Sequence, residues 1–167
     1  MKYTNSYHSL ANFGRELLDK NSLVEGLPLI SKYAKDVIGA QRCSIFIYDD
    51  QKKEFWTTIS DGVEKIIVAA DKGLVGYTLK TKRPVVANDA YAHPQFLSDI
   101  DKGTGFTTSS VITAPIFSST NEVVGVFELL NKEDGFSNDD VKFMVFFAHY
   151  ISGFIELTDI FLKEEGL

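Results

Sequence analysis

The segment Asn88–Ser110, NDAYAHPQFLSDIDKGTGFTTSS, separates two runs of strand-forming residues, VVAN at 85–88 and SVITAPIF at 110–117. It contains a proline, two glycines, three aspartates and many hydroxyl side chains. Connections of this length are uncommon in compact domains unless they carry a function. We therefore expect a functional loop between two strands, with the rest of the chain as its scaffold, and we call this segment the lid.

Strand patterns surround the lid on both sides. The runs are rich in β-branched and aromatic residues, and polar turns separate them into two hairpins and two further strands. The expected strands are Arg42–Tyr48, Glu54–Ile59, Val63–Ala69, Val85–Asn88, Ser110–Phe117 and Val123–Asn131. The turn before the third strand is Asp61-Gly62.

Helical spacing of apolar residues predicts helices at both ends of the chain and one in the middle. The second helix begins after Ser22 as N-cap and ends at Gly39, and Ser137 is the expected N-cap of the last helix. The expected helices are Leu10–Lys20, 23–38, Leu74–Leu79 and a long one that starts after Ser137.

The last helix is apolar on more than one face. One stripe, which includes Met144 and Ile151, is expected to cover the sheet. The other, which includes Phe147 and Phe154, needs a partner. That partner is either the N-terminal helix together with the same helix of a second copy, giving a homodimer, or the chain itself with both stripes covered internally.

Bulk composition favours one globular domain. The 167 residues are 44% hydrophobic and 24% charged, which argues against disorder. The net charge of -6 and the scattered basic residues exclude a nucleic-acid footprint. The most apolar run, Val141–Leu157, is interrupted by polar residues and too short for membrane insertion. The single cysteine, Cys43, fits a reducing, cytoplasmic location.

These elements give an α+β fold, an antiparallel sheet with terminal helices on one face and loops with short helices on the other. Several residues are candidates for ligand contacts. Asp71-Lys72-Gly73 opens a short helix and could bind a phosphate, and the hydroxyls around Thr104 and Thr108 could bind a sugar or a base. Glu128 lies in an otherwise apolar strand and needs a hydrogen-bond donor. Each candidate also has a purely structural interpretation. The hydroxyls could cap the backbone of the loop, and Glu128 could be a carboxylate at a sheet edge that faces water.

The collinear motifs CSIFIYD, SDG, AADKGLVGY, NDAYAHPQF, GTGFTTSSVITAPI and VVGVFELLNK resemble the GAF domain family, above all the regulatory GAF domains of cyclic-nucleotide phosphodiesterases and bacterial cyclases. The resemblance implies a six-stranded antiparallel sheet with a small-molecule pocket on one face. It divides the chain into a flexible or linker segment at 1–9, one GAF domain at 10–157 and a helical extension at 158–167 towards an output domain.

In the phosphodiesterase branch the ligand is a cyclic nucleotide, so the resemblance implies cyclic GMP or cyclic AMP here, with no required cofactor and no metal. Lys132 and Asp140 match the pair that pins the lid in that family. The ligand contacts implied by the resemblance are Ser44, Asp61, Ala70, Asp101 and Thr104 at the base and Thr108 and Glu128 at the sugar and phosphate.

Ser60 departs from the family pattern, because it stands where the family stacks an aromatic ring on the purine, and Val141 replaces the final Glu of the lid-pinning motif. Loss of that stacking removes about 1–3 kcal/mol of affinity.

The resulting hypothesis is a non-enzymatic sensor module of a bacterial signalling protein with a ligand under the lid. The alternative is a dimerisation scaffold with a vestigial pocket. A free methionine sulfoxide reductase of this fold would need more cysteines than Cys43, and His93 has no partner for catalysis.

Overall fold

The computed structural model describes residues 2–19, 23–61 and 65–164. A six-stranded antiparallel sheet with strand order β3-β2-β1-β6-β5-β4 forms its centre. The strands are β1 (Ala40–Asp49), β2 (Glu54–Ser60), β3 (Ile67–Ala69), β4 (Val85–Ala87), β5 (Val111–Phe117) and β6 (Val123–Lys132). The predicted α+β class, sheet and hairpins are therefore confirmed.

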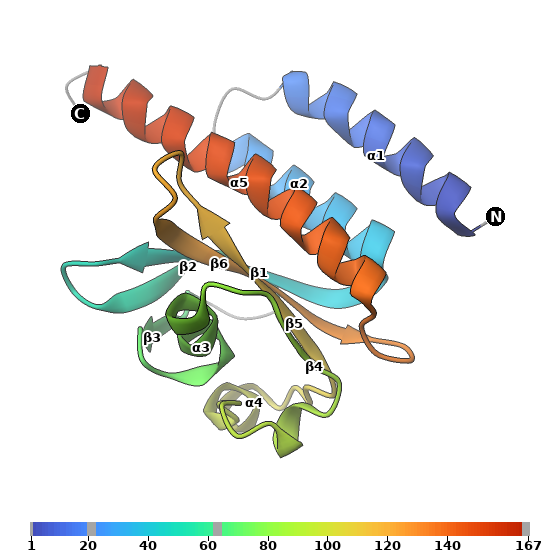
Figure 1. The fold of residues 1–167 in the computed structure, drawn as a ribbon, viewed down its shortest axis with the longest axis vertical. Coiled ribbons are helices and arrows are strands. Elements are labelled where there is room, and N and C mark those ends of the chain that lie inside the picture. The colour runs from blue at the N-terminus through green and yellow to red at the C-terminus, as the bar shows by residue number, and fades with distance from the viewer. Residues whose placement is uncertain (1, 20–22, 62–64, 165–167) are drawn as a thin grey trace.

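Helices cover both faces of the sheet (Figure 1). Three of them, α1, α2 and α5, lie on one face, whereas α3 and α4 lie on the other with the lid. Their bounds are α1 (Lys2–Leu18), α2 (Leu23–Ile38), α3 (Gly73–Thr81), α4 (Asp99–Thr104) and α5 (Asn138–Glu164), with a short 3₁₀ turn, η1, at Ala90–Ala92. No helix in the described parts of the chain has the length and apolar character to span a membrane.

The larger core lies between the sheet and the first helical layer. On α2, the side chains of Leu27, Ile30, Ala34 and Ile38 are buried at helical spacing. The helix ends as predicted at Gly39, which adopts φ +86°. A Cβ would make this conformation sterically costly, and glycine has none.

The two apolar stripes of α5 are both used within the chain. Met144 and Ile151 are fully buried against the sheet. Phe147 and Tyr150 make edge contacts with Phe13 of α1, with ring centroids 5.3 and 5.2 Å apart. Contacts within one chain, the second of the two predicted alternatives, therefore cover most of the apolar surface of α5.

Ser137 caps α5 as expected, because its Oγ accepts from the backbone N–H of Asp140 at 3.3 Å. Asp140 Oδ2 in turn accepts from the backbone N–H of Ser137 at 2.7 Å, which completes a reciprocal capping box. Ser22, the cap predicted for α2, and Gly62 of the predicted turn lie outside the described residues.

Some elements differ from the prediction. Helix α1 begins at Lys2, so most of the segment expected to be a linker is helical. Strand β3 contains only three residues, because it pairs with β2 from Glu54 to Trp56 only. The lid contains η1 and α4, which sequence periodicity missed because α4, DIDKGT, is short and carries no apolar stripe.

Candidate functional site

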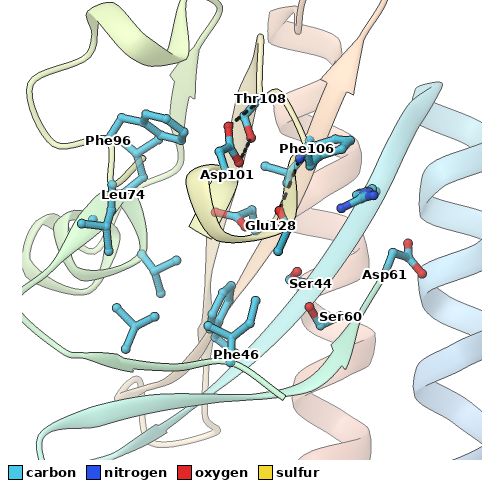
Figure 2. A pocket seen from close by; sticks show the side chains of 18 of the residues that line it. Ser44, Phe46, Ser60, Asp61, Leu74, Phe96, Asp101, Phe106, Thr108 and Glu128 are labelled. Carbon is cyan, nitrogen blue, oxygen red and sulfur yellow. Dashed lines mark hydrogen bonds between the residues drawn. The ribbon is translucent and has the colours of Figure 1, made fainter. Parts of the chain in front are cut away.

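A cavity lies between the sheet and its second covering layer, enclosed by β1, β2, β6, α3 and the lid (Figure 2). Apolar side chains form most of its walls, among them Phe46, Val68, Leu74, Phe96 and Phe106. The volume of this cavity is about 80 Å³. That space holds a few waters, whereas pockets for drug-sized ligands measure roughly 300–1,000 Å³. In this structure the lid therefore covers the cavity closely.

Three polar residues form a row across the floor of the cavity. Ser44 of β1 is the register partner of both Ser60 on β2 and Glu128 on β6. Directly opposed residues of an antiparallel pair lie on the same face of the sheet, so all three side chains face the cavity, as Figure 2 shows. Among the described residues, Ser60 Oγ is the one buried side-chain polar atom without a hydrogen-bond partner.

The Glu128 carboxyl has no hydrogen bond or ion pair within the described part of the chain. It is partly accessible only because it faces the cavity. Burial, with a smaller contribution from the nearby charge of Asp101, raises the pKa of Glu128 to about 7. A buried carboxyl without hydrogen bonds is energetically unfavourable, and a ligand that donates hydrogen bonds to it would remove this cost.

Asp101 and Thr108 stabilise the lid itself. Asp101 Oδ1 accepts from Thr108 Oγ1 at 2.8 Å, and Asp101 Oδ2 accepts from the Thr108 backbone N–H at 2.8 Å and from the Tyr91 hydroxyl at 2.6 Å. Both residues line the cavity, as does Thr104. Because both Asp101 oxygens are already bonded, this carboxylate has little acceptor capacity left for a ligand.

One oxygen of the other predicted aspartate is also occupied. Asp61 lies at the cavity edge with its carboxylate directed away from Glu128 (Figure 2). Its Oδ2 accepts from Lys35 Nζ at 2.7 Å and from the Cys43 backbone N–H at 2.9 Å. Ala70 does not line this cavity at all. It lies in a separate surface depression beside Tyr77 and Lys53, and its N–H donates to the Lys53 carbonyl.

Asn131, at the end of β6, holds the C-terminal end of the lid. Its Oδ1 accepts from the backbone N–H groups of Ser109 at 2.7 Å and Ser110 at 3.3 Å, and its Nδ2 donates to the Thr107 carbonyl at 2.9 Å. The residue adopts φ +56°, a left-handed conformation that asparagine tolerates better than most residues.

Asn88 holds the N-terminal end of the lid. Its Oδ1 accepts from the Phe136 N–H at 2.7 Å and its Nδ2 donates to the Phe136 carbonyl at 3.0 Å. A Cβ at Gly135, where φ is +79°, would lie 2.8 Å from the Asn88 side chain. The loop between β6 and α5 therefore anchors one end of the lid and Asn131 the other.

The predicted pair of Lys132 and Asp140 forms, with Nζ to Oδ2 at 2.6 Å. Asp140 is buried and Lys132 is largely shielded, so water screens this pair less than an exposed one. The pair closes the loop from β6 to α5, and the Lys132 N–H donates to Ser110 Oγ of the lid at 3.2 Å. It therefore positions the anchors of the lid instead of holding the lid directly.

Sequence reasoning missed Arg42 and Phe106. The Arg42 guanidinium lies 3.6 Å from the centroid of the Phe106 ring, a cation–π contact that joins the lid to β1. The sequence signal was an aromatic residue between hydroxyls in a polar loop, but its partner is distant in the chain. Asn131 lies in the motif VVGVFELLNK that resembles the family, yet spacing alone did not reveal its bonds to the lid.

No metal centre emerges from the described residues. No three His, Cys, Asp or Glu side chains among them gather as metal ligands. His93 is a turn residue, as predicted, because its Nδ1 accepts from the Gln95 N–H. Cys43 is fully buried, and burial raises the pKa of its thiol to about 12, which suppresses thiolate chemistry.

The family model of the GAF domain matches residues 22–155. The chain belongs to the GAF domain family. The GAF fold is also that of a solved domain from a phosphoenolpyruvate-protein phosphotransferase of Coxiella burnetii, with a TM-score of 0.83, 21% identity and coverage of 98% of this chain and 97% of that one. As a GAF domain, it is a member of a regulatory and sensory family.

Two curated relatives of this GAF domain are phosphodiesterases. One is a probable 3',5'-cyclic phosphodiesterase of Caenorhabditis elegans, 28% identical over 136 residues, which are 72% of this chain and 18% of the relative. The other is a dual 3',5'-cyclic-AMP and -GMP phosphodiesterase of Takifugu rubripes, 29% identical over 75% of this chain and 16% of the relative. The chain thus spans less than a fifth of either relative.

Proposed function

We propose that this GAF domain is the sensor module of a larger signalling protein and binds a small molecule under the lid, with a cyclic nucleotide as the first candidate. The observation that carries this proposal is the enclosed cavity with an unpartnered carboxyl, Glu128, on its floor. An apolar cavity with a few convergent polar groups and a perturbed pKa is typical of a ligand site.

The first turn of α3 provides a place for the phosphate. Lys72, Gly73 and Leu74 line the cavity where this helix begins. The first N–H groups of a helix have no partner within it and carry the positive end of its dipole. A cyclic phosphate placed there would leave the sugar and base to the floor and the lid.

The closed lid determines how such a ligand acts. A nucleotide needs more room than the cavity provides, so binding has to displace the lid against the contacts of Arg42 and Asn131. A ligand shifts this equilibrium only by the difference between its affinities for the two lid positions. The start of α5 follows the loop that anchors the lid, which gives lid movement a route towards an output domain.

Titration calorimetry with cyclic GMP and cyclic AMP tests the proposal on the 167-residue chain. We expect saturable heat with at least one of them, and a weaker response in Leu74→Glu, which places a charge in the apolar wall. Absence of heat from both nucleotides at high micromolar concentration would rule out the nucleotide.

The alternative is a dimerisation scaffold. It is favoured by Leu157, which is 67% exposed on α5 beside a groove formed with His149 and Phe154. Light scattering that shows a dimer unaffected by Glu128→Ala and Thr108→Ala, together with no thermal shift from a ligand library, would support the scaffold over the sensor.

A further inference from the structure

Two carboxyl groups line the cavity from opposite sides. Glu128 lies on β6 in the floor, and Asp101 lies on α4 in the lid. In Figure 2 the Glu128 carboxyl lies beneath the turn of α4 that carries Asp101, and the charge of Asp101 acts on it. Floor and lid thus each contribute one carboxyl group to the same enclosed space.

Asp101 connects α4 to both ends of the lid. It accepts hydrogen bonds from the Tyr91 hydroxyl on one side and from the backbone N–H and the hydroxyl of Thr108 on the other. In all three bonds it is the acceptor, as an ionised carboxylate is. A repulsive force on Asp101 therefore acts on the lid as a whole.

The neighbours of Glu128 on the sheet are uncharged. Its register partners are Ser44 on β1 and Thr113 on β5, and the Thr113 hydroxyl bonds to that of Thr78 on α3 at 2.6 Å. Burial and, to a smaller extent, Asp101 act on the Glu128 carboxyl, and both oppose its ionisation. An ionised Glu128 is thus unfavourable while the lid covers it.

The other charged residues that line the cavity are Arg42, Asp61 and Lys72. Lys72 is largely exposed, and one oxygen of Asp61 accepts from a lysine of α2. The Arg42 guanidinium is stacked on Phe106 of the lid. An ionised Glu128 attracts this guanidinium, and movement towards the carboxylate would separate it from Phe106. Ionisation of Glu128 therefore also draws a cation away from the lid.

The direction of the pH effect follows from proton binding. The pKa of Glu128 is about 7 under the lid, against an ordinary value of 4.5. When the lid moves away, water reaches the carboxyl and returns its pKa towards the ordinary value. Between these pH values the covered state binds more protons than the open state, so rising pH favours the open state. Above this window the balance no longer changes with pH.

We propose that Glu128 and Asp101 form a proton-controlled gate. The lid covers the cavity while the Glu128 carboxyl keeps its proton, and loss of that proton displaces the lid and opens the cavity. Access to the cavity therefore increases as pH rises towards neutrality. The gate is a property of the empty domain and does not depend on which ligand binds under the lid.

Amide hydrogen exchange of the empty 167-residue chain at pH 6 and pH 8 tests the gate. The parent chain is compared with Glu128→Gln at each pH, so that the intrinsic effect of pH on exchange cancels. We expect the ratio of parent to variant exchange rates at Gly105 and Thr108 of the lid to rise about tenfold from pH 6 to pH 8. Between pH 8 and pH 9 it should stay nearly constant.

Two controls separate lid opening from other effects. Glu122→Gln makes the same chemical change at an exposed position between β5 and β6, and its lid exchange should equal that of the parent at both pH values. Low urea accelerates exchange that occurs through global unfolding, whereas lid opening exposes little surface. Lid exchange at pH 8 should therefore respond to urea much less than exchange at Ile45 of β1 or Phe127 of β6.

Three results would overturn the gate. The first is a lid exchange ratio that is the same at pH 6 and pH 8. The second is slower lid exchange in the parent than in Glu128→Gln at pH 8, which would show that a cation such as Arg42 pairs with the carboxylate under the covering lid. The third is lid exchange that urea accelerates as strongly as exchange in β1 and β6.

The gate and the proposed function fail separately. The exchange experiment contains no ligand, so the absence of heat from both cyclic nucleotides rejects the nucleotide and leaves the gate intact. Lid exchange that does not depend on Glu128, in a chain that binds a cyclic nucleotide, rejects the gate and leaves the sensor function intact.

Discussion

Glu128 is a carboxyl among apolar neighbours, since Val126 and Leu130 flank it on the same face of β6. The charged groups that line the same cavity are Arg42, Asp61, Lys72 and Asp101, and all of them have other contacts. The folded protein therefore holds the proton on Glu128 more tightly than the unfolded chain does. This has a direct effect on stability.

The sign follows from proton binding. The pKa of Glu128 is about 7 in the folded state against an ordinary value of 4.5, so between these pH values the native state binds more protons than the unfolded state. Its contribution to stability therefore falls as pH rises through this window and stays constant above it. Glu128→Gln, which is uncharged, should be about 3 kcal/mol more stable than the parent chain near pH 8 and about equally stable near pH 4.5.

Urea unfolding at the two pH values measures this difference. Glu133→Gln, at an exposed position, serves as the control and should change stability equally at both. A Glu128→Gln variant that is less stable than the parent at pH 8 would show that the carboxylate has a favourable partner in the folded state.

At the scale of elements, the lid depends on side chains from other parts of the chain. Asn131 connects β6 to Thr107, Ser109 and Ser110, and Asn88 connects the lid to the loop before α5. These anchors are connected to the start of α5 by the capping turn at Ser137 and by the ion pair of Lys132 with Asp140. Lid position and the start of α5 are thus mechanically linked.

Asn131→Ala tests this anchor. It removes the bonds to the lid and places alanine at φ +56°, so we expect a loss of about 2–4 kcal/mol in the free energy of unfolding. Hydrogen exchange at Ser109 and Ser110 should increase more than in β1 or β2.

Asn131→Gly separates the two causes, because glycine accepts the backbone conformation but makes no bonds. It should be more stable than Asn131→Ala and show the same fast exchange in the lid. Slow exchange at Ser109 and Ser110 in both variants would contradict the anchoring role.

At the scale of the whole molecule, the two faces of the sheet have different tasks. One face lies against α1, α2 and α5 and the other against α3 and α4 (Figure 1). The first packs into a large apolar core, and the second holds the cavity. Phe13 of α1 is fully buried and its ring contacts Tyr33, Phe147 and Tyr150. Helix α1 is therefore part of the domain core and not a loose extension.

Phe13→Ala should lower the free energy of unfolding by about 3–5 kcal/mol, since it leaves a large cavity among three aromatic rings. Thermal unfolding followed by circular dichroism measures the loss. Ligand affinity below the melting temperature should be unchanged because the site lies on the opposite face. A stability equal to that of the parent chain would show that α1 detaches readily.

The sequence by itself determined the fold class, most elements and the position of the lid. Alternating and β-branched runs specify strands, and local signals such as Gly39 and Ser137 set helix ends, because these effects depend on neighbouring residues only. It also named the pair of Lys132 and Asp140 and several polar residues that line the cavity, among them Ser44 and Glu128, but not its apolar walls.

Only the tertiary structure decided which polar groups remain free for a ligand. Asp61 is occupied by a lysine of α2, Asp101 by residues of the lid, and Asn131 by backbone groups that fold back over β6. Each carboxylate or amide has a fixed number of hydrogen bonds to give or accept, and partners distant in sequence use that capacity first. What remains on the floor of the cavity, Ser60, Ser44 and Glu128, follows from the packing of the whole chain.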